Sequence, residues 1–121
     1  MRLKNTILAI ILLIPAISGA TALSLTNETE NVLSFSHRNV CSHDIGNILP
    51  KSIKIIPGVI FEELCKDKTT YCTVTAYKSA NCHGALAATI TLNTTDGVTG
   101  VYPHPQSGLS LYGKGFNIYF K

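Results

Sequence analysis

The stretch Tyr71–Leu92, YCTVTAYKSANCHGALAATITL, decides how the rest of the chain is interpreted. It contains two cysteines and a histidine, so it is either a metal or redox site or part of a disulfide-linked β-framework. In YCTVTAY, the residues Cys72, Val74 and Ala76 alternate with tyrosine and threonine, and ALAATITL also alternates. A period of two is typical of β-strands with one buried face. We therefore predict two strands joined by the loop KSANCHG.

The outward residues of the first strand form a candidate binding surface. Tyrosine and threonine are good strand formers that tolerate contact with water, and tyrosine is enriched at binding surfaces because its large rigid ring carries a hydroxyl group. Alternatively, these residues only stabilise the sheet through cross-strand pairs. Tyr102 and Tyr112 are further candidates, although no sequence pattern places them beside the others. The predicted surface consists of Tyr71, Thr73, Thr75 and Tyr77.

Short runs with β-like patterns continue along the chain and are separated by Gly, Pro, Asn and Asp residues. The segment 59–65, VIFEELC, fits both a strand and a helical turn, and both possibilities stay open. No long segment keeps the 3.6-residue period of a helix. The pattern predicts an all-β fold in a single domain, either an antiparallel β-sandwich or a small barrel.

The first 22 residues have the three parts of a secretory signal peptide. Arg2 and Lys4 form a basic start, an apolar run follows, and small residues lead to Ala22. The apolar run is shorter than the roughly 20 residues needed to span a bilayer, so no stable membrane anchor is expected. We expect cleavage after Ala22, with Ala20 as the alternative. The product is a β domain of residues 23–121 that is secreted or periplasmic.

The four cysteines, Cys41, Cys65, Cys72 and Cys82, are expected to form two disulfides, because a small exported chain meets an oxidising environment. If 59–65 and 70–77 form a hairpin, Cys65 and Cys82 lie roughly 20 Å apart, too far for a bond. The pairing 65–82 with 41–72 is therefore least favoured. Between the other two, 65–72 with 41–82 is favoured over 41–65 with 72–82.

A metal site is the competing interpretation of the cysteines. Its donors would be Cys41 and Cys82 with the nearby histidines His37, His43 and His83. Thiolate and imidazole suit zinc or copper, but the spacing of a preformed chelate is missing. We therefore expect no metal ligands.

Charge and motifs exclude other classes of protein. Two of the ten basic residues lie in 1–22, so eight remain against seven acidic residues, a net charge of +1. This balance provides no basic surface for nucleic acid. No G-x-S-x-G motif and no phosphate-binding glycine loop occur. We therefore expect neither an enzyme nor a bound cofactor.

Four features together resemble small secreted cysteine-containing proteins of bacteria with an intracellular lifestyle. They are Cys41-Ser42, the spacing of Cys65 and Cys72, YKSANCHG at 77–84 and the terminal GFNIYF at 115–120. Such proteins are largely uncharacterised. The resemblance implies secretion and identifies no catalytic residues.

The leading hypothesis is a secreted, non-catalytic domain that binds a protein or a glycan. The alternative is a secreted inhibitor or toxin that presents a disulfide-braced loop, either 78–84 or the Pro-His-Pro loop at 102–108. Two Asn-x-Thr sequences, at Asn27 and Asn93, match the N-glycosylation pattern, and the sequence does not decide whether either is modified.

Overall fold

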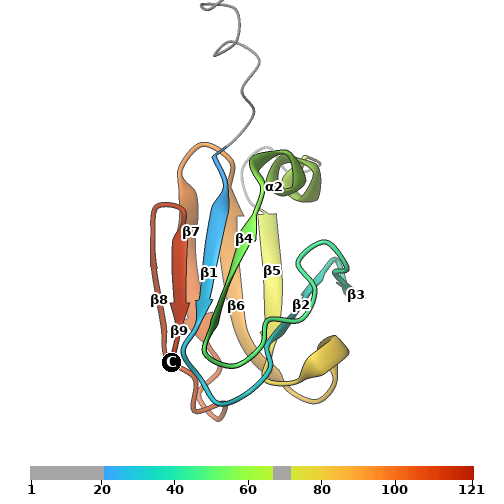
Figure 1. Ribbon diagram of the computed structural model, residues 1–121, viewed down its shortest axis with the longest axis vertical. Coiled ribbons are helices and arrows are strands. Elements are labelled where there is room, and N and C mark those ends of the chain that lie inside the picture. Colours follow the sequence, from blue (N-terminus) through green and yellow to red (C-terminus); the bar gives the residue numbers. More distant parts are fainter. Residues whose placement is uncertain (1–20, 67–71) are drawn as a thin grey trace, which may run out of the picture.

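The computed structural model describes residues 21–66 and 72–121, and it confirms the expected class (Figure 1). Two β-sheets pack face to face, one with four strands in the order β4-β1-β9-β8 and one with five in the order β3-β2-β5-β6-β7. The strands are β1 (Leu23–Asn27), β2 (Ser34–His37), β3 (Val40–Cys41), β4 (Ser52–Ile56), β5 (Cys72–Tyr77), β6 (Leu86–Asn93), β7 (Gly97–Pro103), β8 (Leu111–Lys114) and β9 (Asn117–Phe120). The helical segments among the described residues are α2 (Gly58–Cys65) and the short 3-10 turn η1 (Ala80–Cys82).

One strand pair departs from the antiparallel expectation. β1 runs antiparallel to β4 but parallel to β9, with Leu25 opposite Ile118. A parallel pair needs a long connection, and here most of the chain lies between the two strands. The four-stranded sheet is therefore complete only when the C-terminal hairpin β8–β9 docks against β1.

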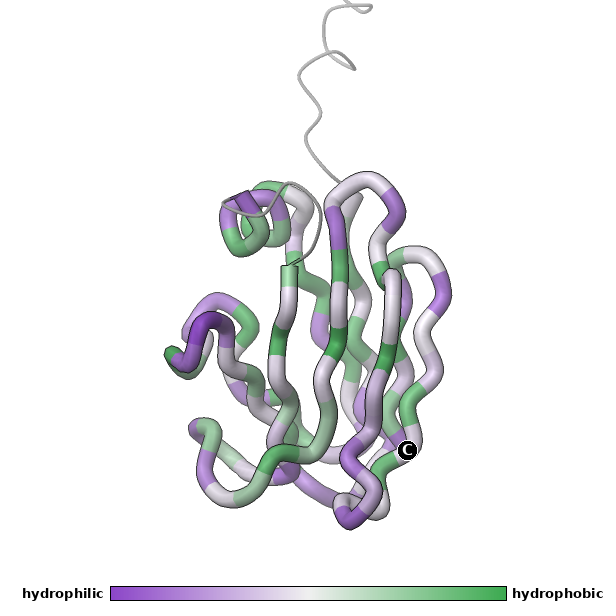
Figure 2. Tube along the Cα trace, turned by 180° about the vertical axis from the view of Figure 1, so that it is seen from behind, coloured by the Kyte–Doolittle hydropathy of each residue, from purple (hydrophilic) through white to green (hydrophobic). Residues whose placement is uncertain are grey.

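Inward-facing apolar side chains from both sheets form the core. The ring of Phe35 on β2 meets Phe120 on β9 edge to face, with centroids 5.6 Å apart. Both rings are fully buried, and burial of such a side chain contributes about 1.5–3 kcal/mol. Seen from behind (Figure 2), apolar and polar segments alternate along the strands, as expected when one face of each strand is buried.

The two sheets also meet at their edges, where the edge strands β7 and β8 are in contact. The backbone N–H of Val98 donates to the carbonyl oxygen of Gly115 at 2.7 Å. Gly97, the first residue of β7, has a positive φ of 81°, and a Cβ there would collide with the same carbonyl group. Glycine is therefore required where the β6–β7 hairpin meets the β8–β9 turn.

The ambiguous segment 59–65 is helical and belongs to α2, which lies at one end of the sandwich (Figure 1). Pro57 precedes the helix, and its carbonyl oxygen accepts the N–H groups of Ile60 and Phe61. Phe61 and Cys65, four residues apart on one helix face, are both buried. The Phe61 ring contacts the ring of Phe116 at 6.2 Å between centroids. Packing of this helix face against the core therefore favours a helix over a strand for residues 59–65.

The favoured disulfide pairing is confirmed. Cys41 is bonded to Cys82 with Cα atoms 5.8 Å apart, and Cys65 is bonded to Cys72 with Cα atoms 5.1 Å apart. The hairpin assumed for the pairing is wrong, because Cys65 ends a helix rather than a strand. The exclusion of 65–82 still holds, since β5 runs from Cys72 away from the helix. Two disulfides indicate folding in an oxidising, extracellular type of environment.

Candidate functional site

The outer face of the five-stranded sheet carries the residues predicted for the binding surface. Thr73 on β5 is exposed, and Thr75 and Tyr77 are half-buried, whereas the residues between them are buried. The structure therefore places these three side chains on the outward side, as the alternation predicts. Tyr71 lies outside the described residues.

The neighbouring strand β6 carries a second row of threonine hydroxyl groups beside the row on β5. Thr91 lies directly opposite Thr73, and Thr89 lies directly opposite Thr75. Neighbouring strands are about 4.8 Å apart, and alternate residues of one strand are about 6.8 Å apart. The four threonines therefore form a regular rectangular array, which we call the threonine array. Thr89 and Thr91 are not among the residues predicted for the binding surface, although the repeated T-x-T in TVT and TIT is a signal for them.

Tyr102 on β7 continues the face beyond β6. It is paired with Thr89 and is 59% exposed. A Cβ atom at Gly100 would stand 2.6 Å from the Tyr102 hydroxyl oxygen and 2.9 Å from its Cε2 atom. The tyrosine ring therefore lies back along its own strand in the space that Gly100 leaves open. A ring held in this way keeps one side toward the sheet and exposes the other to solvent.

Tyr77 borders the array on the opposite side. Its hydroxyl oxygen is 3.2 Å from the Oγ atom of Ser36 on β2, so the ring extends across that strand. On the far side of the array, the Thr99 hydroxyl donates to Thr91 Oγ1 at 2.9 Å. These contacts hold the face in place from both sides. We call the threonine array together with Tyr77 and Tyr102 the binding face.

A tight turn between β2 and β3 stands at one end of the binding face. Arg38 and Asn39 have positive φ values of 55° and 64°, the conformation of a two-residue hairpin turn. Together with His37, Thr73 and Thr75 they line a shallow hollow of about 260 Å³. A guanidinium and an amide therefore lie next to the hydroxyl groups of β5.

The two loops named in the inhibitor hypothesis lie side by side. The Lys78 ammonium donates to the Ser107 carbonyl oxygen at 2.7 Å, which ties the loop after β5 to the loop after β7. A cleft of about 380 Å³ opens between residues 78–87 and 104–107. We call it the loop cleft. Cys82, within the first of these loops, is bonded to Cys41.

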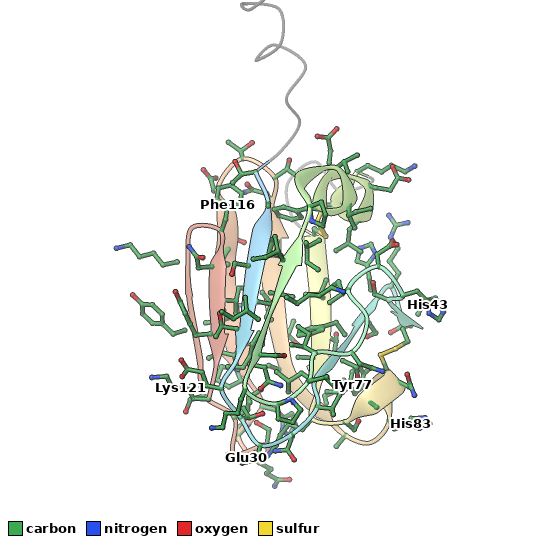
Figure 3. All side chains as sticks on the ribbon, viewed as in Figure 1. Glu30, His43, Tyr77, His83, Phe116 and Lys121 are labelled. Atoms are coloured by element: carbon green, nitrogen blue, oxygen red, sulfur yellow. A yellow bond between two sulfur atoms is a disulfide. The ribbon has the colours of Figure 1, made fainter. Side chains whose placement is uncertain are left out.

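The cysteines of the proposed metal site are both in the Cys41–Cys82 disulfide, so neither supplies a thiolate. His37 and His43 line one open hollow of about 430 Å³. Figure 3 shows His43 and His83 on the side of the molecule that carries β3 and η1. Within residues 21–66 and 72–121, no three His, Cys, Asp or Glu side chains are placed to hold a metal ion.

The two Asn-x-Thr sequences have different surroundings. Asn27 is fully buried, and its amide nitrogen donates to the carbonyl oxygens of Asn31, Ile48 and Leu49. That nitrogen, the atom to which a glycan would be attached, is inaccessible in the folded chain. Asn93 is half-buried in the β6–β7 turn, where its Oδ1 accepts backbone N–H groups from the following residues.

No protein-family model, curated protein or solved structure matches this chain. Among the helices that the structure describes, none is long and apolar enough to cross a membrane.

Proposed function

We propose that this protein is an exported, non-catalytic β-sandwich module that binds a glycan chain through the binding face. The observation that carries the proposal is the threonine array flanked by two tyrosines. Export is supported by the signal-like first 22 residues and by the two disulfides. The resemblance to small secreted bacterial proteins is in keeping with this proposal.

The chemistry of the binding face suits a sugar chain. Each threonine hydroxyl can both donate and accept hydrogen bonds, as sugar hydroxyls do. The apolar faces of tyrosine rings can pack against the C–H groups of sugar rings, while their hydroxyls reach water or ligand. Small molecules favour concave pockets, whereas this face is a sheet surface with a repeat. An extended ligand with its own repeat therefore fits it better than a compact one.

A protein partner fits the same face less well. Energetically important interface residues are enriched in tryptophan, tyrosine and arginine, whereas threonine is under-represented among them. Here the tyrosines lie at the borders and the centre consists of threonine. We therefore choose the glycan over the protein as the partner.

Co-sedimentation with insoluble polysaccharides, together with a glycan array, tests this proposal. We expect the purified, disulfide-bonded protein to bind at least one neutral polysaccharide and Thr75→Arg to abolish binding, because a long charged side chain would cover the array. Thr26→Arg, on the outer face of the other sheet, is the matched control and should bind normally. Absence of glycan binding, or equal loss in both variants, would refute the proposal, as would specific capture of a protein through Thr75.

Export has its own test. Intact-mass measurement of protein recovered outside the producing cell should give a chain that begins at Leu23. Its mass should be lower by about 4 Da than that of the four-thiol form, because two disulfides remove four hydrogens. A chain that retains residues 1–22 would contradict cleavage.

The second candidate is a secreted inhibitor or toxin. The observation in its favour is the disulfide that braces the 78–84 loop at Cys82, together with the Lys78–Ser107 contact to the Pro-His-Pro loop. Inhibition of a protease in a panel at micromolar protein concentration, lost on substitution in either loop, would favour this candidate over the glycan-binding module.

A further inference from the structure

The loop cleft has the size of a site for a small organic ligand. Its volume of about 380 Å³ lies within the range of roughly 300–1,000 Å³ found for ligand pockets. Ala85, Leu86 and Ala87 supply an apolar wall, and polar side chains from both loops supply the remainder. A ligand with both a carbon skeleton and a polar group would match this division.

Several contacts hold the first loop in position. Ser79 Oγ donates to the carbonyl oxygen of His83, and the His83 N–H donates to the carbonyl oxygen of Ala80. The Cys82 N–H donates to Ser34 Oγ at 2.8 Å, and the disulfide fixes the same residue to Cys41. The backbone on both sides of the His83 side chain is therefore preorganised.

The second loop is also held in position. The His104 N–H donates to the carbonyl oxygen of Ala87 at 2.8 Å. The Gln106 N–H donates to His104 Nδ1 at 3.4 Å, so Nε2 is the ring nitrogen left to contact a ligand.

Every ionisable side chain that lines the loop cleft is basic. They are Lys78 and His83 from the first loop and His104 from the second, and no Asp or Glu side chain is among the described lining residues. The Lys78 ammonium has three N–H donors, and the contact with Ser107 accounts for one of them. The amide of Gln106 provides a further donor. This combination attracts and hydrogen-bonds an oxyanion.

We propose that the loop cleft binds a sugar-sized organic oxyanion, a carboxylate, sulfate or phosphate attached to a small carbon skeleton. Lys78, His83 and His104 contact the anionic group, and the Ala85–Ala87 wall contacts the carbon skeleton. This site is distinct from the binding face and does not require the proposed function. An anionic ligand other than the glycan, or an acidic substituent of the glycan, would bind in the loop cleft at the end of the sheet.

NMR titration of the whole, disulfide-bonded protein with glucuronate, glucose 6-phosphate, inorganic phosphate and glucose tests the site. The amide signals of residues 78–87 and 104–107 should shift with both acidic sugars. Glucose should cause no shift, and inorganic phosphate should bind more weakly than the acidic sugars because it does not contact the apolar wall. The two acidic sugars distinguish carboxylate from phosphate as the preferred group.

Substitutions give the second readout. His83→Gln and His104→Gln should each reduce affinity for the acidic sugars by up to about fivefold. His43→Gln is the matched control, because it removes a histidine that lies outside the cleft. Equal binding of glucose and glucuronate, or equal binding of inorganic phosphate and the acidic sugars, would overturn the proposal. The His83→Gln variant should still co-sediment with polysaccharide as the unchanged protein does. A failed oxyanion proposal can therefore be distinguished from a failed proposal for the binding face.

Discussion

The two outer faces of the sandwich contain similar residues in different arrangements. On the five-stranded sheet, two T-x-T segments lie side by side, so identical residues occupy all four corners of the array. On the four-stranded sheet, one row crosses all four strands as Ile53, Thr26, Tyr119 and Tyr112. Strand propensity accounts for threonine, tyrosine and isoleucine on both faces. It does not account for the repeat, which only one face has.

The two faces also differ in the neighbours of their exposed tyrosines. Tyr102 on the binding face is 59% exposed, and Tyr112 on the opposite face is 60% exposed. Tyr102 lies over Gly100 beside the threonine array. Tyr112 instead contacts Tyr119, with ring centroids 6.2 Å apart and planes tilted by 41°. Equal exposure therefore does not give equal opportunity for binding, because the neighbours of each ring differ.

Removing the hydroxyl groups of the array should have the largest effect. Valine at positions 73, 75, 89 and 91 keeps the shape and strand preference of threonine but cannot form hydrogen bonds. At about 0.5–1.5 kcal/mol for each lost hydrogen bond, affinity for the polysaccharide should fall at least about thirtyfold. Depletion binding assays would measure this fall, and Thr26→Val is the control on the other face. Unchanged affinity would show that the hydroxyl groups do not contact the ligand.

The two tyrosines provide the next test. Tyr102→Ala should weaken polysaccharide binding about five- to thirtyfold, because it removes an aromatic ring beside the array, an interaction that contributes about 1–2 kcal/mol. Tyr112→Ala should leave affinity unchanged. Thermal unfolding of both variants would check that each is folded. If the two variants lose affinity equally, the difference between the faces is not functional.

Much of the fold could be predicted because a period of two is a local property. The alternation in YCTVTAY and ALAATITL identifies two strands, and the cysteine positions narrow the disulfide pairing. Segment 59–65 could not be assigned, because Phe61 and Cys65 fit a helix face while the short apolar run also fits a strand. Contact between Phe61 and Phe116 favours the helix, and that contact joins distant parts of the chain.

The candidate site was predictable only in part. The outward position of Thr73 and Thr75 follows from alternation within one strand, whereas their alignment with Thr89 and Thr91 depends on register between strands. Sequence alone also does not show that Tyr102 and Tyr112 belong to different sheets.

The two Asn-x-Thr sequences show most clearly that a motif does not reveal the burial of its residues. The motif at Asn27 is identical in pattern to that at Asn93, yet only the fold reveals that Asn27 is buried and bonded to three carbonyl oxygens.

Gly100 offers a subtler way to disturb the binding face. Gly100→Ala places a methyl group where the Tyr102 ring lies, so the ring must move although every ligand-contacting residue is still present. We expect affinity for the polysaccharide to fall about two- to fivefold, less than for Tyr102→Ala. The double variant should bind no more weakly than Tyr102→Ala alone, since the two changes act through one ring. Additive losses measured in the same assay would contradict this explanation.

The smallest effect is expected on the four-stranded sheet. Ile53 and Ile55 on the edge strand β4 are 64% and 55% exposed, with Lys54 between them. Replacing both isoleucines with threonine removes apolar surface that is already in water, so the free energy of unfolding should change by less than about 0.5 kcal/mol. Polysaccharide affinity should stay within about twofold, since a surface change outside the site removes no contact with the ligand. Denaturant titration and co-sedimentation would measure both quantities. A large loss of affinity would mean that the exposed apolar face, rather than the ordered hydroxyl face, contacts the ligand, because strand β4 lies at the edge of the other sheet.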